Sequence, residues 1–158
     1  MVVASCYLID YTGRFYFPVT PSELWAAIER LEQFEHFWGW LSDLSVDGPA
    51  LEAGTVLRGT VAPPVPYRMY VEVELTECVP ERLIDADVTG DLAGVAHLRI
   101  RPCPQGTVAD VEWSLEMLQA PMRMAARVAH PLLKWGHDRV VDATVAGFRY
   151  HLRRDPTA

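Results

Sequence analysis

The chain has 158 residues, of which 50% are hydrophobic and 22% are charged, a composition typical of one globular domain spanning residues 1–158 and not of a disordered segment. Its formal net charge of -7 disfavours binding to the phosphate backbone of a nucleic acid or to an anionic membrane surface. No apolar stretch approaches the length of a membrane span, so stable membrane insertion is not expected.

The cysteines, Cys6, Cys78 and Cys103, contain no Cys-x-x-Cys pair. Their number and spacing favour neither a disulfide framework nor a zinc site, which fits a reducing compartment. The first residues lack the basic segment and apolar run of a secretory leader, and no glycine-rich phosphate loop or metal-ligand cluster follows. We therefore expect a cytoplasmic protein with no metal ion and no cofactor.

The N-terminal part of the chain predicts one strand and two short helices. Residues Ser5–Phe17 alternate loosely and are rich in Tyr, Phe and Ile, as is typical of a strand. Thr20-Pro21-Ser22-Glu23 forms a capping box with proline at the first helical position, which predicts a helix start. A second short helical piece is predicted over Glu32–Trp40.

Phe34, Phe37, Trp38 and Trp40 place four large aromatic side chains within seven positions. One face of a short helix cannot bury all of them. They form either the wall of a core or the lip of a cavity, and a further interpretation is a docking patch for another protein.

From Asp43 to Gln119 the chain predicts strands joined by short turn signals such as Asp47-Gly48-Pro49 and Thr89-Gly90-Asp91. The regular spacing indicates an antiparallel meander with one buried and one solvated face. The alternation is clearest in two strands, whose expected inward residues are Tyr67, Met69, Val71, Val73 and Leu75 in one and Ala109, Val111, Trp113, Leu115 and Met117 in the other.

Pro121–Arg154 predicts one long helix of roughly 50 Å, which can cross the whole sheet. Its inner stripe holds many small side chains, such as Ala126 and Gly147, and small residues that face a curved sheet leave room for a cavity. Pro131 cannot donate a backbone hydrogen bond, so we expect a kink there. The kink would reset the helical phase and turn Trp135 away from solvent.

His137 is the best candidate for a catalytic residue, because the expected inner surface carries almost no other ionisable group. It would either orient a ligand carbonyl or act as a general acid or base, and the alternative is a structural histidine. Asp138 is not expected to orient it, because adjacent helical residues point to different faces. The expected ligand-binding cavity is lined by Trp40, Tyr67, Met69, Trp113, Leu115, Leu133, His137, Val140 and Thr144.

This pattern resembles the START-like superfamily, also called SRPBCC, and in particular its polyketide cyclase/dehydrase and lipid-transport branch. The resemblance covers nearly the whole chain and rests on pattern-level matches. These are Phe17-Pro18-Val19 leading into Thr20-Pro21-Ser22-Glu23-Leu24-Trp25, Pro66-Tyr67, Gly90-Asp91-Leu92-Ala93-Gly94, Gly106-Thr107 with Glu112-Trp113, and Trp135-Gly136-His137-Asp138. The resemblance implies an α+β helix-grip fold, in which a curved seven-stranded antiparallel sheet wraps a long C-terminal helix and two short helices follow the first strand.

The function expected first is binding or carriage of a hydrophobic small molecule, such as a lipid, a quinone or a polyketide-like aromatic. The second hypothesis is a polyketide cyclase, aromatase or dehydratase acting on a bound poly-β-ketone, with His137 or Tyr67 shuttling a proton. The third is a protein-interaction module that uses the aromatic patch Phe34–Trp40. No catalytic motif runs through the superfamily, so whether the chain is an enzyme stays open, and a homodimer is compatible with the sequence.

Overall fold

The computed structural model of the protein describes residues 8–48, 50–64 and 68–154. Its helical elements are α1 (Pro21–Ile28), the 3-10 turn η1 (Leu31–Gln33), α2 (Phe34–Phe37) and α3 (Ala120–Arg154). Its strands are β1 (Leu8–Phe17), β2 (Leu41–Asp47), β3 (Val56–Val61), β4 (Met69–Val79), β5 (Leu83–Gly90), β6 (Leu92–Cys103) and β7 (Gly106–Met117). The order of elements is the predicted one.

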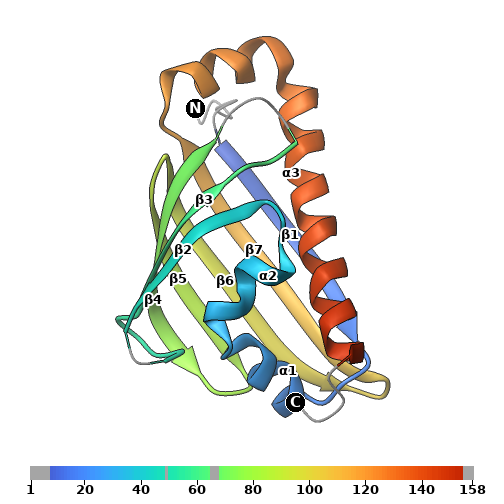
Figure 1. Cartoon of the computed structure of the whole chain (residues 1–158). Coiled ribbons are helices and arrows are strands. Elements are labelled where there is room, and N and C mark those ends of the chain that lie inside the picture. The colour runs from blue at the N-terminus through green and yellow to red at the C-terminus, as the bar shows by residue number, and fades with distance from the viewer. Residues whose placement is uncertain (1–7, 49, 65–67, 155–158) are drawn as a thin grey trace, which may run out of the picture.

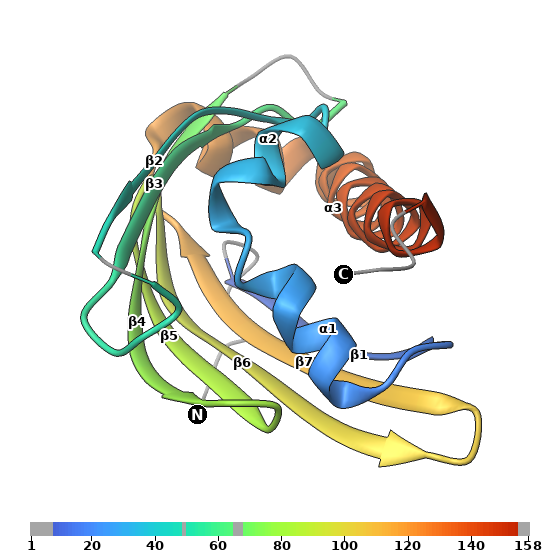
Figure 2. The same ribbon diagram turned by 60° about the horizontal axis from the view of Figure 1, so that its bottom comes forward.

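The strands form one seven-stranded antiparallel sheet in the order β1-β7-β6-β5-β4-β3-β2. The sheet is open, because its edge strands β1 and β2 do not pair with each other in this order. It is strongly curved, and α1, α2 and α3 all lie on its concave side (Figure 2). The helix α3 runs beside β1 along the length of the sheet (Figure 1).

Alternation along the strands decides which side chains face the concave side. The predicted inward residues of β4 and β7 that the structure describes, Met69 to Leu75 and Ala109 to Met117, do face the core or the space beneath α3. Gly94 has a φ of 159°, and a Cβ at this position would collide with the carbonyl oxygen of Ser114. Glycine therefore allows β6 and β7 to approach closely where the sheet bends.

The region after α1 differs from the prediction. Instead of one helix over Glu32–Trp40, the chain forms η1 and the single-turn α2, and it is extended at Trp38, with φ -122° and ψ 103°. The predicted capping box of α1 is confirmed, since Thr20 accepts a hydrogen bond from the Glu23 amide and Glu23 accepts one from the Thr20 amide. This cap starts a helix that buries Leu24 and Trp25 in the core.

Helix α3 continues through Pro131 without a break. Figure 1 shows that its first turns, in orange, change direction before the long descending part, as expected from a proline that removes a backbone donor. The expectation for Trp135 was wrong, because 45% of this residue is exposed. The bend redirects the helix axis, but it does not move Trp135 to the inner face.

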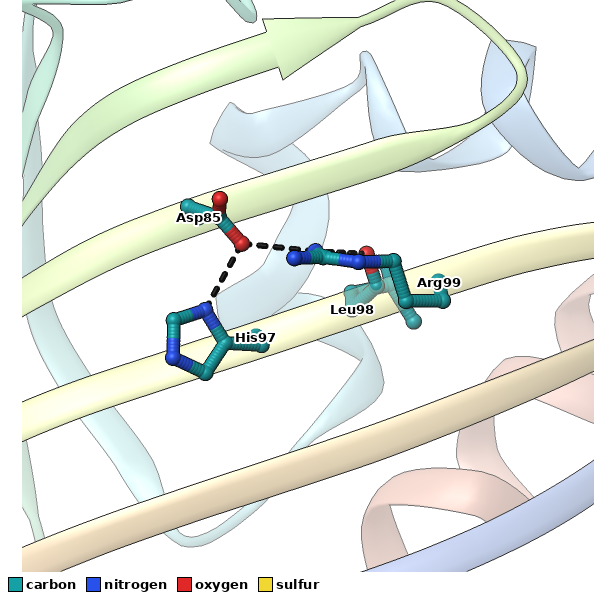
Figure 3. A network of polar contacts seen from close by, with 4 residues as sticks. All are labelled: Asp85, His97, Leu98 and Arg99. Carbon is teal, nitrogen blue, oxygen red and sulfur yellow. Dashed lines mark hydrogen bonds and ion pairs between the residues drawn. The ribbon is translucent and has the colours of Figure 1, made fainter.

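The outer face of the sheet carries cross-strand ion pairs. Asp85 on β5 lies opposite His97 on β6, and its Oδ1 is 2.7 Å from His97 Nδ1 and 2.6 Å from a guanidinium nitrogen of Arg99 (Figure 3). The hydrogen bond from Arg99, and to a smaller extent the one from His97, holds the pKa of Asp85 below its usual value. This polar network lies on the side of the sheet opposite Leu98, which faces the concave side.

Candidate ligand-binding cavity

A cavity of about 790 Å³ lies between the concave face of the sheet and α3. Side chains from β1, α1, the α2 region, the inner faces of β3 to β7 and the inner side of α3 surround it. Its size falls within the usual range for pockets that take a small organic molecule. The curvature of the sheet therefore leaves a space that the protein's own side chains do not fill. The α3 side chains around it, such as Leu133, Val140 and Phe148, are mostly large, and the small residues Ala126 and Gly147 of the predicted inner stripe do not line it.

Most of the residues predicted to line a cavity do so. The described ones are Trp40, Met69, Trp113, Leu115, Leu133, His137, Val140 and Thr144. Tyr67 lies outside the described residues, so its position stays a prediction. That these side chains bind a ligand is likewise a prediction, which we take up below as a proposal.

The interior of the cavity is apolar, and its charged residues lie at one edge. Asp10, Lys134 and Asp138 line the cavity but are exposed, and Leu8 is the fourth exposed residue of the lining. Because these four belong to the start of β1 and to α3, the mouth of the cavity lies between these two elements. We call these four residues the cavity mouth.

His137 sits just inside the mouth and uses both of its ring nitrogens. Trp113 Nε1 donates a hydrogen bond to His137 Nε2 over 3.1 Å, and His137 Nδ1 is 3.2 Å from Asp138 Oδ1. An indole N–H can only donate, so Nε2 must be the unprotonated nitrogen of the ring. The proton is then on Nδ1, where it is donated to the Asp138 carboxylate.

The expectation that Asp138 cannot orient His137 was wrong. Adjacent helical residues do point to different faces, but ring Nδ1 lies close to the backbone, and the short Asp138 side chain bends back to reach it. A carboxylate therefore holds the tautomer of His137, and the side chain is about one fifth exposed at 19%. His137 nevertheless offers a ligand no free ring nitrogen while Trp113 occupies Nε2.

Tyr11 is the functional candidate that the sequence analysis missed. It lies opposite Trp113 in the β1–β7 register, and the two rings stack with centroids 4.7 Å apart. Its ring also meets His137 edge-on at 5.2 Å. Burial, followed by the negative charges of Asp138 and Asp142, raises the pKa of the Tyr11 phenol. Loose alternation along Ser5–Phe17 was the available signal, since it puts Tyr11 in phase with Phe15 and Phe17.

A second aromatic pair lies elsewhere in the cavity wall. The rings of Trp38 and Trp40 stack with centroids 5.2 Å apart and an interplanar angle of 13°. Trp38 Nε1 donates to the backbone oxygen of Thr144 over 3.0 Å. Trp40 Nε1 is buried and has no hydrogen-bond partner among the described residues. The cavity lining thus contains a buried N–H donor that this part of the chain leaves unsatisfied.

These positions bear on the predicted aromatic docking patch. Phe34 is buried in the core, and Trp38 and Trp40 are half-buried and line the cavity. The Phe37 side chain is outside the described part of the structure. The three described aromatics therefore contribute to the core or to the cavity lining, and a docking role for this segment stays a prediction.

The described residues contain neither a metal-binding cluster nor a helix that could span a membrane. No group of three or more His, Cys, Asp or Glu side chains gathers there as metal ligands would. No described helix combines the length and the apolar character that crossing a bilayer requires.

Comparisons with known proteins identify the fold. No family model matches the sequence, and no curated protein matches it. TTHA0849 from Thermus thermophilus has a TM-score of 0.75 at 14% identity, covering 95% of this chain and 100% of that one. The di-domain ARO/CYC StfQ from the steffimycin biosynthetic pathway has a TM-score of 0.72 at 8% identity, covering 97% of this chain and 54% of that one. Ara h 8.0201 has a TM-score of 0.61 at 14% identity, covering 89% and 97%.

These similarities define the class of structure. The chain has a helix-grip fold, with a curved seven-stranded antiparallel sheet, short helices after the first strand and a long C-terminal helix. The predicted resemblance to the START-like superfamily is confirmed at the level of the fold. Proteins of this fold differ in ligand and activity, so the fold alone assigns neither to this chain.

Proposed function

We propose that the protein binds a hydrophobic small molecule in its cavity, in the manner of a carrier or sequestering protein. The observation that carries this proposal is an apolar cavity of about 790 Å³ whose charged lining residues are confined to the mouth. An uncharged interior favours a neutral or largely apolar ligand, because a buried charge without a partner is costly. Lipids, quinones and polyketide-like aromatics all fit this description.

Trp40 narrows the chemistry of the proposed ligand. Its buried indole N–H has no partner among the described residues, and leaving such a donor unsatisfied costs about 1–3 kcal/mol. A ligand with a carbonyl or quinone oxygen would supply the missing acceptor once a rotation of the Trp40 ring turns the buried Nε1 toward the cavity, while the neighbouring Trp38 and Trp40 rings would pack on a flat ring system. We therefore favour a planar, carbonyl-bearing ligand over a saturated acyl chain.

Native mass spectrometry of the protein purified from its own host is the direct test of a bound ligand. A retained mass would give the ligand class. Calorimetric titration with a naphthoquinone and with naphthalene then tests the role of Trp40. Trp40→Phe should weaken naphthoquinone binding by roughly three- to tenfold, since one hydrogen bond is lost, and should leave naphthalene binding nearly unchanged. Absence of saturable binding by both probes, together with an empty native protein, would contradict the proposal.

A second candidate function is cyclisation, aromatisation or dehydration of a bound poly-β-ketone. It is favoured by the His137–Asp138 pair beside the Tyr11 ring, and by the similarity of the fold to that of StfQ, a di-domain ARO/CYC. His137 would need to release Trp113 before Nε2 can take a proton, because a general base needs a free lone pair. Incubation with a poly-β-ketone substrate and detection of an aromatic product would distinguish turnover from binding. Turnover that persists in His137→Gln would exclude this residue as the base.

A further inference from the structure

The first half of α3 carries an apolar outer face. Met124 and Val128 precede the bend at Pro131, whereas Leu132 and Trp135 follow it (Figure 1). The spacings of four and three residues put each pair on one side of its own part of the helix. Their exposed fractions are 69%, 89%, 49% and 45%. We call these four residues the apolar stripe.

The other side of the same helical segment is also apolar. Met122 and Ala126 are each only 1% exposed, and Leu133 lines the cavity. A helix that is apolar on both sides is normally covered on both. Farther along α3 the outer side becomes polar, with Arg139 and Asp142 exposed. The apolar stripe is thus a local feature, which the packing of α3 on the sheet does not require.

The charge of this segment is opposite to the charge of the whole chain. Residues 120–137 contain Arg123, Arg127 and Lys134 but no Asp or Glu, although the formal net charge of the chain is -7. Arg123 is paired with Glu116 over 2.9 Å, and the exposed Asp138 follows directly after this segment. The basic character of the exposed surface therefore comes from Arg127 and Lys134. Arg127 and Lys134 are exposed and lie seven residues apart, on one flank of the stripe. Exposed apolar side chains that end in a tryptophan and are flanked by basic residues are typical of helices that lie in a bilayer interface.

The stripe lies at the end of the molecule where the cavity opens. Leu118, 45% exposed, shortly precedes α3, and Leu8, 39% exposed, pairs with Glu116 two residues earlier. Leu8 and Lys134 also belong to the cavity mouth. Figure 1 shows the first turns of α3 lying across this end of the sheet. Exposed apolar surface is therefore gathered next to the mouth.

We propose that the apolar stripe docks on the surface of a bilayer that contains anionic phospholipid. Its side chains would lie among the outer acyl segments, and Arg127 and Lys134 would face the headgroup phosphates. A second copy of the chain fits less well, because a two-fold contact through identical stripes would bring two sets of like charges together. Docking in this orientation places the cavity mouth close to the bilayer.

Flotation of the ligand-free full chain with vesicles tests this docking. The protein should bind phosphatidylcholine vesicles that contain phosphatidylglycerol more tightly than vesicles of phosphatidylcholine alone, and added salt should weaken the difference. Val128→Gln should lower the partition coefficient roughly tenfold, because it removes an apolar side chain from the acyl region. Arg127→Gln should weaken binding roughly fivefold on the anionic vesicles only.

Val95→Gln is the matched control, since it makes the same change at a valine that is 41% exposed on β6, away from the stripe. Its vesicle binding should equal that of the wild type. Absence of binding to the anionic vesicles, or an equal loss in both variants, overturns the proposal. So does a wild-type dimer in sedimentation that Val128→Gln converts to a monomer, because the stripe would then be covered by a second copy. The cavity proposal is unaffected by any of these results, since no ligand is present.

Discussion

The hydrogen bond from Trp113 to His137 sets what these two side chains can offer a ligand. While it is intact, Trp113 Nε1 and His137 Nε2 satisfy each other within the protein. A ligand in the cavity would then meet these two side chains mainly through van der Waals contact. His137 is therefore first a structural partner of Trp113. A role in binding or turnover requires a ligand that competes for the same bond.

We predict that His137→Phe lowers the free energy of unfolding by about 1–3 kcal/mol, because it leaves the half-buried Trp113 N–H without an acceptor. His137→Gln, whose amide oxygen can still accept, should lose less. Denaturant unfolding measures both, and a double-mutant cycle with Trp113→Phe isolates the pair. Purely additive losses in that cycle would show that the hydrogen bond contributes nothing to stability.

Asp85 leads to a prediction about pH. Its pKa is lower in the folded protein than in the unfolded chain, so its ionised form stabilises the fold above the unfolded pKa, and this contribution is lost as the pH falls through the folded pKa. The stability difference between the wild type and Asp85→Asn should thus be largest near neutral pH and should shrink below about pH 4. Asp87→Asn, an exposed change on the same strand, is the control in denaturant titrations. A difference that grows in acid would contradict the assignment.

At the scale of elements, the start of α1 depends on a local signal. Thr20 Oγ1 accepts from the Glu23 amide over 3.2 Å, and the Thr20 amide donates to Glu23 over 2.7 Å. We predict that Thr20→Ala costs about 1 kcal/mol of stability in thermal or denaturant unfolding, while Thr20→Asp retains most of it. An equal loss in both variants would mean that the side-chain cap is not what stabilises this helix start.

The elements also show which sequence signals predict structure and which do not. Strict alternation predicted the inward faces of β4 and β7, because a half-buried strand allows only that pattern. The segment Glu32–Trp40 was predicted as one helix. The helix ends at Phe37 instead, because Trp38 and Trp40 pack into the cavity wall, and this tertiary packing outweighs the local helical preference. Pro131 indicated a bend, yet its direction depends on long-range packing, and so the exposure of Trp135 could not be predicted.

The candidate site was predictable where it follows strand and helix periodicity. Trp113, Leu115, Leu133 and Val140 belong to such patterns and line the cavity. The polar contacts were not predictable in the same way. The approach of Asp138 to His137 depends on side-chain rotamers, and the stacking of Tyr11 depends on strand register, which the sequence does not specify by itself.

At the scale of the whole molecule, the open sheet allows the volume of the cavity to change. The strand edges β1 and β2 do not pair, and the hydrogen bonds described between α3 and the residues before Gln119 each involve a side chain, as in Trp38 to Thr144 and Arg149 to Tyr16. A small outward movement of α3 would thus enlarge the cavity without breaking the ladder of backbone hydrogen bonds in the sheet. Amide hydrogen exchange should reveal this asymmetry. A bound ligand should slow exchange along α3 several-fold. The strands β5 and β6 lie in the middle of the sheet, where we expect exchange only through global unfolding, and should change little.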